Sequence, residues 1–252
     1  MQTKTLVASL ALAISIAGAE TRTATVEDPR PLAKALESLE TAYGVPITYE
    51  DAPYVNAGEI ADVTFQVRGS QTGGPRILVP RGGSLSFAYE AVEAPLANDA
   101  ARLAASTAIT GLLTNYQTAS GARFVMVPGS VPLHVVPARF IDQAGQVQSL
   151  KPILDTPVSL PARPRTAAEL VGDLCDALTR TSGQTVVLGN IPYALLGRQQ
   201  TSFSVSNRAA RSVLDQLFAE IGAKLSWQVF HDPGLNWYVL NIHLVQSPGK
   251  EQ

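Results

Sequence analysis

One order of structural signals occurs twice along the chain, and it constrains the fold more than any other feature. LESLETAYGVPITYED (residues 36–51) and CDALTRTSGQTVVLGN (residues 175–190) each place a helical pattern before a glycine and a strand pattern after it. Each half then reads helix, strand, strand, helix, strand, strand, with one extra strand in the first half. A repeated order of this kind predicts two modules related by internal duplication. Helices mixed with short strands predict an α+β fold, in which two helices of each module pack on short mixed sheets.

The first module is expected over residues 31–140. Leu32, Leu36 and Leu39 lie at helical spacing, and Gly44 is suited to end that helix. Val63, Phe65 and Val67 alternate, which predicts a strand. The remaining elements are expected as strands within residues 45–51 and 84–95, a helix over 96–119, and two strands within 122–140.

The second module is expected over residues 157–246. Thr166 and Glu169 form a capping-box pattern at the start of a helix that Gly183 ends. Asn207 is predicted to cap a second helix, which runs from Arg208 to Ile221. The strands are expected within residues 156–161, 184–190, 201–207, 223–230 and 236–245.

The N-terminus has the pattern of a secretory signal peptide. Lys4 precedes a short apolar run from Leu6 to Ala17, and Ala17-Gly18-Ala19 is a small-x-small cleavage site. We therefore expect residues 1–19 to be removed after Ala19 and the protein to be periplasmic or secreted. Residues 20–30 and 247–252 are expected to be flexible ends, and residues 141–156 a linker.

Composition excludes several classes of partner. The formal net charge of the 252-residue chain is −2, and its basic residues are scattered, whereas nucleic-acid binding needs a concentrated positive surface. After the signal, no apolar run is long enough to span a bilayer of ~30 Å as a helix. Cys175 is the only cysteine, so an intrachain disulfide is excluded and the core must stabilise the fold.

The second half resembles a known module. Leu170, Leu174 and Leu178 supply an apolar helix, and Phe203 and Val205 supply an alternating strand. The second helix carries Val213, Leu214 and Leu217, and Gly222 and Trp227 follow it. This series resembles the short N-terminal (STN) domain shared by secretins and TonB-dependent receptors. The resemblance is clearest over residues 166–245 and looser over residues 31–137.

The resemblance implies an envelope location and a protein-docking role without catalysis. No pore-forming region follows Val245 in this chain, so we expect a free-standing pair of modules that acts as a soluble partner of an unknown envelope protein.

Catalytic, metal and cofactor sites are not expected. His134, His231 and His243 lack the spacing of a zinc site, and the hairpin turn near Pro233 and Gly234 should keep His231 away from His243. No G-x-S-x-G motif occurs. The glycine pair in PRGGS (residues 80–84) is read as a turn rather than a phosphate cradle. Cys175 falls on the apolar side of its helix and is read as a buried core residue.

The last strand supplies a candidate interaction surface. Its face with Tyr238, Leu240 and Ile242 is apolar and should be core. Trp237, Asn241 and His243 share the opposite face. An exposed tryptophan beside polar neighbours is typical of a protein–protein hot spot, whereas a buried one would pack against the other half.

Three functions remain open. The leading hypothesis is a non-enzymatic exported protein that recognises proteins, with strand addition to a sheet edge as the mode. The alternative is a periplasmic protein that binds a glycan or peptide between its halves, with Trp237 and the loop 69–83 as candidates. The third is an enzyme with an unfamiliar site at His231, Asp232 and His243.

Overall fold

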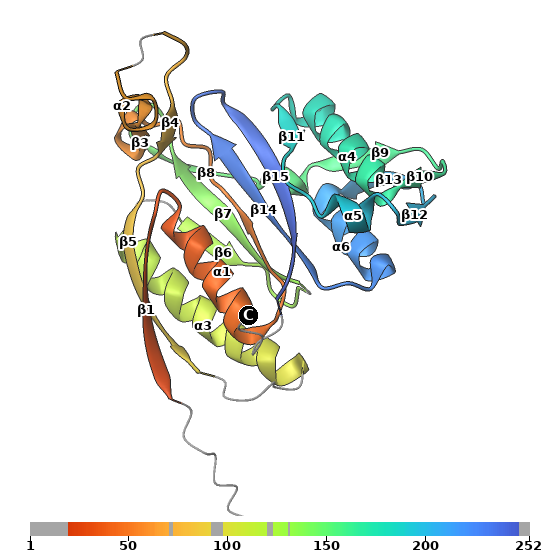
Figure 1. The fold of residues 1–252 in the computed structure, drawn as a ribbon, viewed down its shortest axis with the longest axis horizontal. Coiled ribbons are helices and arrows are strands. Elements are labelled where there is room, and N and C mark those ends of the chain that lie inside the picture. Colours follow the sequence, from red (N-terminus) through yellow and green to blue (C-terminus); the bar gives the residue numbers. More distant parts are fainter. Residues whose placement is uncertain (1–19, 71–72, 92–97, 120–122, 131, 247–252) are drawn as a thin grey trace, which may run out of the picture.

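A computed structural model of the chain describes residues 20–70, 73–91, 98–119, 123–130 and 132–246 (Figure 1). It is an α+β fold, as the sequence predicts. The α-helices are α1 (Pro31–Tyr43), α2 (Thr64–Arg68), α3 (Asn98–Ala119), α4 (Ala167–Ser182), α5 (Tyr193–Leu196) and α6 (Ala210–Ile221). The predicted signal (1–19) and the C-terminal end (247–252) lie outside the described residues.

The first half stacks three layers. Strands β1 (Thr21–Asp28) and β5 (Gly83–Glu90) form a two-stranded antiparallel ribbon over α1 and α3. Below the helices, β7 (Leu133–Ile141) pairs in parallel with β2 (Ile47–Glu50) and antiparallel with β6 (Arg123–Met126). The helices are thereby covered on both sides, which lets leucines on opposite flanks of α1 and α3 become buried.

The second half has the same arrangement of pairs. Strands β9 (Pro157–Leu160) and β13 (Val205–Ala209) form an antiparallel ribbon. On the other side of α4 and α6, β15 (Trp237–Leu244) pairs in parallel with β11 (Val186–Leu188) and antiparallel with β14 (Leu225–Asp232). The smaller elements of both halves are β3 (Ile60–Asp62), β4 (Leu78–Pro80), β8 (Val147–Ser149), β10 (Arg165–Thr166), β12 (Gln200–Thr201), and the 3₁₀ turns η1 (Ala57–Glu59) and η2 (Ile153–Asp155).

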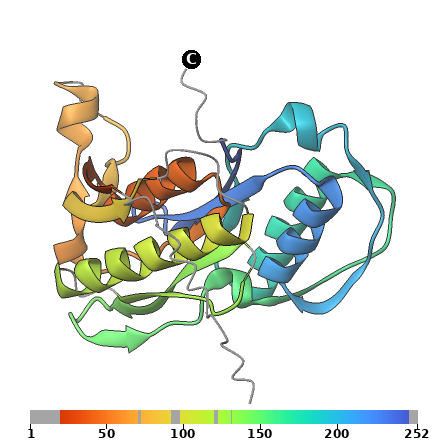
Figure 2. The ribbon, with the colours of Figure 1, turned by 90° about the horizontal axis from the view of Figure 1, so that it is seen from below.

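The two halves share one sheet. Strand β14 pairs in parallel with β2, which gives the order β11-β15-β14-β2-β7-β6, with β8 on the end of β7. Val229 lies beside Glu50 in this pairing, and Gln228 beside Tyr49. Val229 belongs to the core under α4 and α6, whereas Tyr49 belongs to the core under α1 and α3. The two helix pairs therefore cover opposite faces of one sheet (Figures 1 and 2).

Equivalent residues build corresponding parts of the two halves. Gly44 and Gly183 end α1 and α4 in the left-handed conformation that favours glycine. In each half, the helix residue seven positions before the start of the next strand binds that strand's first N–H. The Glu40 side chain accepts from the Ile47 N–H at 2.8 Å, and the Thr179 side chain accepts from the Val186 N–H at 2.9 Å. In each half a side chain of the first helix thus satisfies the first donor of the strand.

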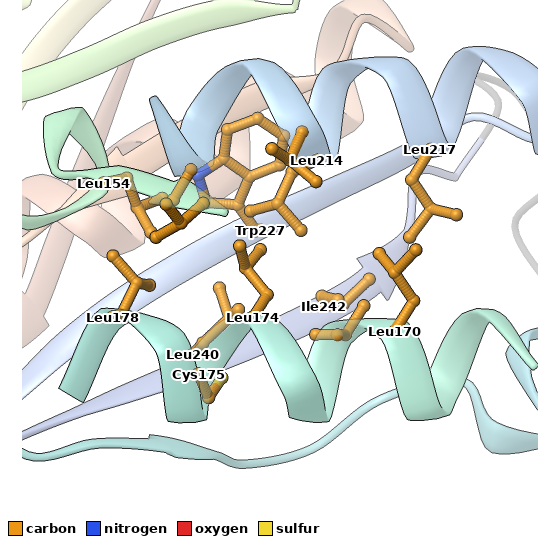
Figure 3. Packing of buried hydrophobic residues seen from close by; sticks show 14 of the residues in the cluster. Leu154, Leu170, Leu174, Cys175, Leu178, Leu214, Leu217, Trp227, Leu240 and Ile242 are labelled. Carbon is orange, nitrogen blue, oxygen red and sulfur yellow. The ribbon is translucent and has the colours of Figure 1, made fainter. Parts of the chain in front are cut away.

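Each half has its own hydrophobic core. In the second half, Leu170, Leu174 and Leu178 on α4 face Trp227 and Leu240 across the layer (Figure 3). The capping box of Thr166 and Glu169 and the end of α4 at Gly183 are formed as predicted. Trp227 pairs with Ile242 of β15, and Phe124 pairs with Pro137 at the corresponding place in β7. Phe124 is therefore the first-half counterpart of Trp227, and both side chains are fully buried.

Three predictions about the elements are wrong. Residues 21–28, predicted to be flexible, form strand β1, because Ala24 and Val26 pack on the first core. The segment 141–156, predicted as a linker, contains β8 and η2, and its Leu154 is fully buried in the second core. Helix α6 begins at Ala210, and Asn207 has φ 48° within β13 instead of capping the helix.

The alternating stretch around Phe65 is also not a strand. It forms the short helix α2, and Phe65 and Val67 are 75% and 65% exposed. Alternation predicts a strand only where one face becomes buried, and these side chains find no such face.

Candidate functional site

The predicted interaction surface lies on β15, the strand next to the edge strand β11 of the shared sheet. Trp237, Asn241 and His243 occupy one face of β15, opposite the core face, as the alternation predicts. Trp237 is 39% exposed, so it meets solvent. Asn241 accepts a hydrogen bond from the Asn190 N–H at 2.9 Å. Asn241 and His243 thus both have hydrogen-bond partners within the chain, since His243 binds Glu40.

His243 links the two halves. Its Nε2 lies 2.5 Å from Oε1 of Glu40 on α1. Burial by itself lowers the pKa of His243, but the hydrogen bond and the charge of Glu40 outweigh it and leave the pKa raised. The charged imidazolium is the form that this contact stabilises.

His231 is held as a neutral imidazole at the same junction. Its Nδ1 accepts a hydrogen bond from the Tyr54 N–H at 3.1 Å, so Nε2 carries the proton and donates to Asn236 at 3.0 Å. The side chain is buried, and burial lowers its pKa although Asn236 and Asp51 act in the opposite direction. The hairpin register places His231 opposite Tyr238 and His243 opposite Ser226, so the two histidines do not face each other.

His134 completes the set at the junction. Its Nδ1 lies 2.7 Å from the Thr48 hydroxyl, and its Nε2 lies 3.3 Å from a carboxylate oxygen of Asp215 on α6. Its ring stacks near Trp227, with ring centres 5.1 Å apart. All three histidines therefore join residues of one half to residues of the other.

Two carboxylates at the end of β2 anchor the junction. The fully buried Glu50 forms an ion pair of 2.5 Å with Arg211 on α6, and Arg211 also binds Asp155 at 3.0 Å. Burial raises the pKa of Glu50, while Arg211 beside it lowers it. An isolated buried charge is costly, so separating the two halves at this pair would leave a charge without compensation unless water reached it.

The neighbouring Asp51 collects donors from both halves. It accepts hydrogen bonds from Arg30 at 2.7 Å, from the Tyr49 hydroxyl at 2.8 Å and from the His231 N–H at 2.9 Å. Arg30 also donates to the His231 carbonyl at 2.7 Å. The sequence analysis missed both carboxylates. The available signal was two consecutive acidic residues at the end of a short strand pattern.

The other predicted sites have structural roles. Cys175 is buried in the second core, and burial raises the pKa of its thiol to about 12. PRGGS forms the turn between β4 and β5, and Gly82 approaches the Asp28 carbonyl so closely that no side chain would fit. Within the described ranges, no three His, Cys, Asp or Glu side chains are grouped to hold a metal ion.

The hollows on the first half include a cavity and a groove. A cavity of about 310 Å³ is lined by Tyr54, Glu59, Ser84 and Tyr116, among others. Burial raises the pKa of the Glu59 carboxyl there. A groove of about 520 Å³ lies between the end of β5 and the exposed flank of α3.

Comparison with protein-family models, with curated proteins and with solved structures gives no match for the chain. In the part of the chain that the structure describes, no helix is both long and apolar enough to cross a membrane.

Proposed function

We propose that this chain is an exported, non-enzymatic envelope protein that recognises other proteins through the edges of its sheets. The observation that carries the proposal is the junction itself. The chain joins its two halves by adding β14 to the edge of β2, with the Asp51 N–H donating to the Val229 carbonyl at 2.8 Å. Strand addition is a general mode of recognition, in which backbone pairing supplies affinity and side chains supply selectivity.

The proposal treats residues 166–245 as an STN-like module. Its support is the order of α4, β11, α6 and β14, which follows the pattern on which the resemblance rests. The apolar N-terminal run with its small-x-small site supports export. Docking is the role that the resemblance implies.

Capture from an envelope extract tests the proposal. The chain from residue 20 onward is immobilised, and an unrelated exported protein of similar size serves as the control bait. We expect at least one envelope protein to be enriched and to be displaced by an excess of the free chain. The proposal fails if no protein is both enriched and displaced at any salt concentration tested.

A second candidate is the binding of a small envelope ligand, and the cavity beside Glu59 favours it. The half-buried Glu59 carboxylate makes no hydrogen bond or ion pair with any other described residue, so it is available to a ligand that carries a donor or a cation. Ligand-dependent shifts of the melting temperature test this candidate. A shift that survives Glu59→Gln would remove this cavity as the site.

A further inference from the structure

The outer edge of β5 presents unpaired backbone groups. The Ala91 N–H donates to the Glu20 carbonyl across the ribbon, which fixes the alternation of inward and outward groups along β5. Ser84, Ser86 and Ala88 therefore direct their N–H and C=O groups away from β1. None of these groups is hydrogen-bonded to another described residue. A regular edge of this length without a bulge is a template for a further strand.

Helix α3 packs against β5 and lines the groove beside the end of this strand. No charged residue of α3 lines the groove. The flank of α3 that faces the groove carries small or apolar side chains, among them Ala100, Leu103, Ala104, Thr107 and Gly111. Leu103 is 71% exposed. Helix α3 packs against β5, and helix α1 packs against β1 and β5. The groove lies beside the last residues of β5, Ala88 to Glu90, and Thr21 and Tyr43 also line it. A strand placed there would cover Leu103.

The corresponding place in the second half is closed. Arg208 on β13 reaches across to α6 and donates to Gln216 at 2.6 Å and to the Ser212 carbonyl at 3.2 Å. Gln216 in turn donates to Glu220 at 2.9 Å. The register of β13 is also interrupted between Val205 and Arg208. Irregular strands and charged side chains are the usual protection of a sheet edge. Strand β5 pairs regularly along its length, and its one charged side chain, Glu90, lies at its last residue.

We propose that the groove between β5 and α3 receives an extended, uncharged segment of a partner protein, which adds to β5 as a third strand. This deepens the proposed function and rests on it. Backbone groups of the segment pair with those of Ser86 and Ala88, and its alternate side chains pack on Leu103 and Ala104. Leu103 and Ala104 offer no polar partner, so a charged side chain packed on them would lose its hydration without compensation, and the segment is uncharged there. Glu90 lies at the end of β5 in the same groove.

A single segment fits this edge better than a second copy of the chain. Adjacent strands lie about 4.8 Å apart, whereas a helix with its side chains is about 10 Å wide. A second copy that paired through its own β5 would also bring its own α3, which packs against β5, next to the first α3.

The test uses a displayed library of random decapeptides as the probe, selected on the chain from residue 20 onward. The affinities of enriched peptides are then measured by fluorescence polarisation for the wild type and four variants. Ala88→Pro removes one outward N–H from β5, and Leu103→Arg places a charge in the groove. Thr23→Pro is the matched control, because Thr23 is paired with Ala88 and lies on the opposite edge of the ribbon. Val67→Arg is the control for a charge at an exposed apolar site.

We expect enriched peptides with uncharged residues at alternate positions. Ala88→Pro should weaken their binding about 3- to 10-fold, the effect of one lost hydrogen bond. Leu103→Arg should weaken it by at least about tenfold, and both controls should bind as the wild type does. Circular dichroism confirms that each variant is folded.

Peptides that bind all four variants equally would overturn the groove assignment and leave the proposed function standing. A library that yields no enriched peptide would also overturn the groove assignment, while the capture experiment judges the function separately.

Discussion

Strands β2 and β11 hold the same place in the two halves, yet only β2 receives a strand of the other half. Glu50, the last residue of β2, binds Arg211, and Asp51, which follows it, binds Arg30. The matching residues after β11 are Gly189 and Asn190. There the chain bends over Asn241, so the Asn190 N–H is bound by a side chain and its carbonyl by the Ile242 N–H.

The strand order within each half therefore does not determine which edge strand, β2 or β11, pairs with a strand of the other half. Both halves have the strand needed for pairing, and of the two edges only the one that β14 joins carries the buried carboxylates Glu50 and Asp51. Gly189 permits the bend because a side chain at that position would collide with Asn241. Specific recognition commonly combines a favoured contact with a blocked alternative.

The two cores can be compared at their largest equivalent residues. Phe124→Ala and Trp227→Ala should each lower the free energy of unfolding by about 3 to 5 kcal/mol. We expect the larger loss for Trp227, because it also stacks near His134 of the other half. Urea denaturation measures both. A clearly larger loss for Phe124 would show that Trp227 does not couple the halves.

Arg211 tests whether the ion pair specifies the β2 edge. Arg211→Ala leaves Glu50 buried without its cation and should cost about 3 kcal/mol or more. Adding Glu50→Gln should recover part of that loss, because it removes the uncompensated charge. Urea denaturation of the single and double variants provides the measurement. A cost below about 1 kcal/mol for Arg211→Ala would mean that the carboxylate is hydrated, contrary to its burial.

Two histidines should give the junction opposite dependences on pH. The lowered pKa of His231 means that its contribution is complete above the unfolded value of about 6.5 and is lost as the pH falls through the folded value. The raised pKa of His243 means that its contribution is complete below about 6.5 and is lost as the pH rises through the folded value.

The free energy of unfolding, measured between about pH 5 and pH 8, separates the two effects. His231→Gln should flatten the acid side of the profile, and His243→Gln the neutral to alkaline side. Unchanged slopes in both variants would remove the histidines as the source of the dependence.

The smallest effect is expected at Arg208, which closes the second groove. Its contacts are exposed, so Arg208→Ala should change the free energy of unfolding by less than about 0.5 kcal/mol. We expect no gain of peptide binding at β13, because the strand stays irregular at Asn207. A gain of binding would show that an open groove suffices without a regular edge.

The fold class and most helix ends follow from local signals. The capping box at Thr166 and the glycines at 44, 183 and 222 mark ends that the structure has at the same residues. Strand β1 was missed because only Ala24 and Val26 of its polar sequence turn inward. Its pairing with β5 depends on residues about 60 positions away, which local patterns do not contain.

Only part of the candidate site was predicted, because local patterns again do not contain contacts between distant residues. Alternation along the last strand was enough to separate the face of Trp237 from the core face. The role of Glu50 and Asp51 depends on Arg211 and His231, which reach them only after the halves have joined. A pair of acidic residues on its own does not show which partner it will meet.

The pairing of β2 with β14 also sets an order of events. Residues 49 and 50 can pair only after residues 228 and 229 have been synthesised, when most of the chain already exists. Contacts so distant in sequence form late and slow folding. Until then, Glu50 and Asp51 stay hydrated at an open edge, where a foreign strand can compete for the place of β14. The last strands to emerge therefore close the edge of one of the first.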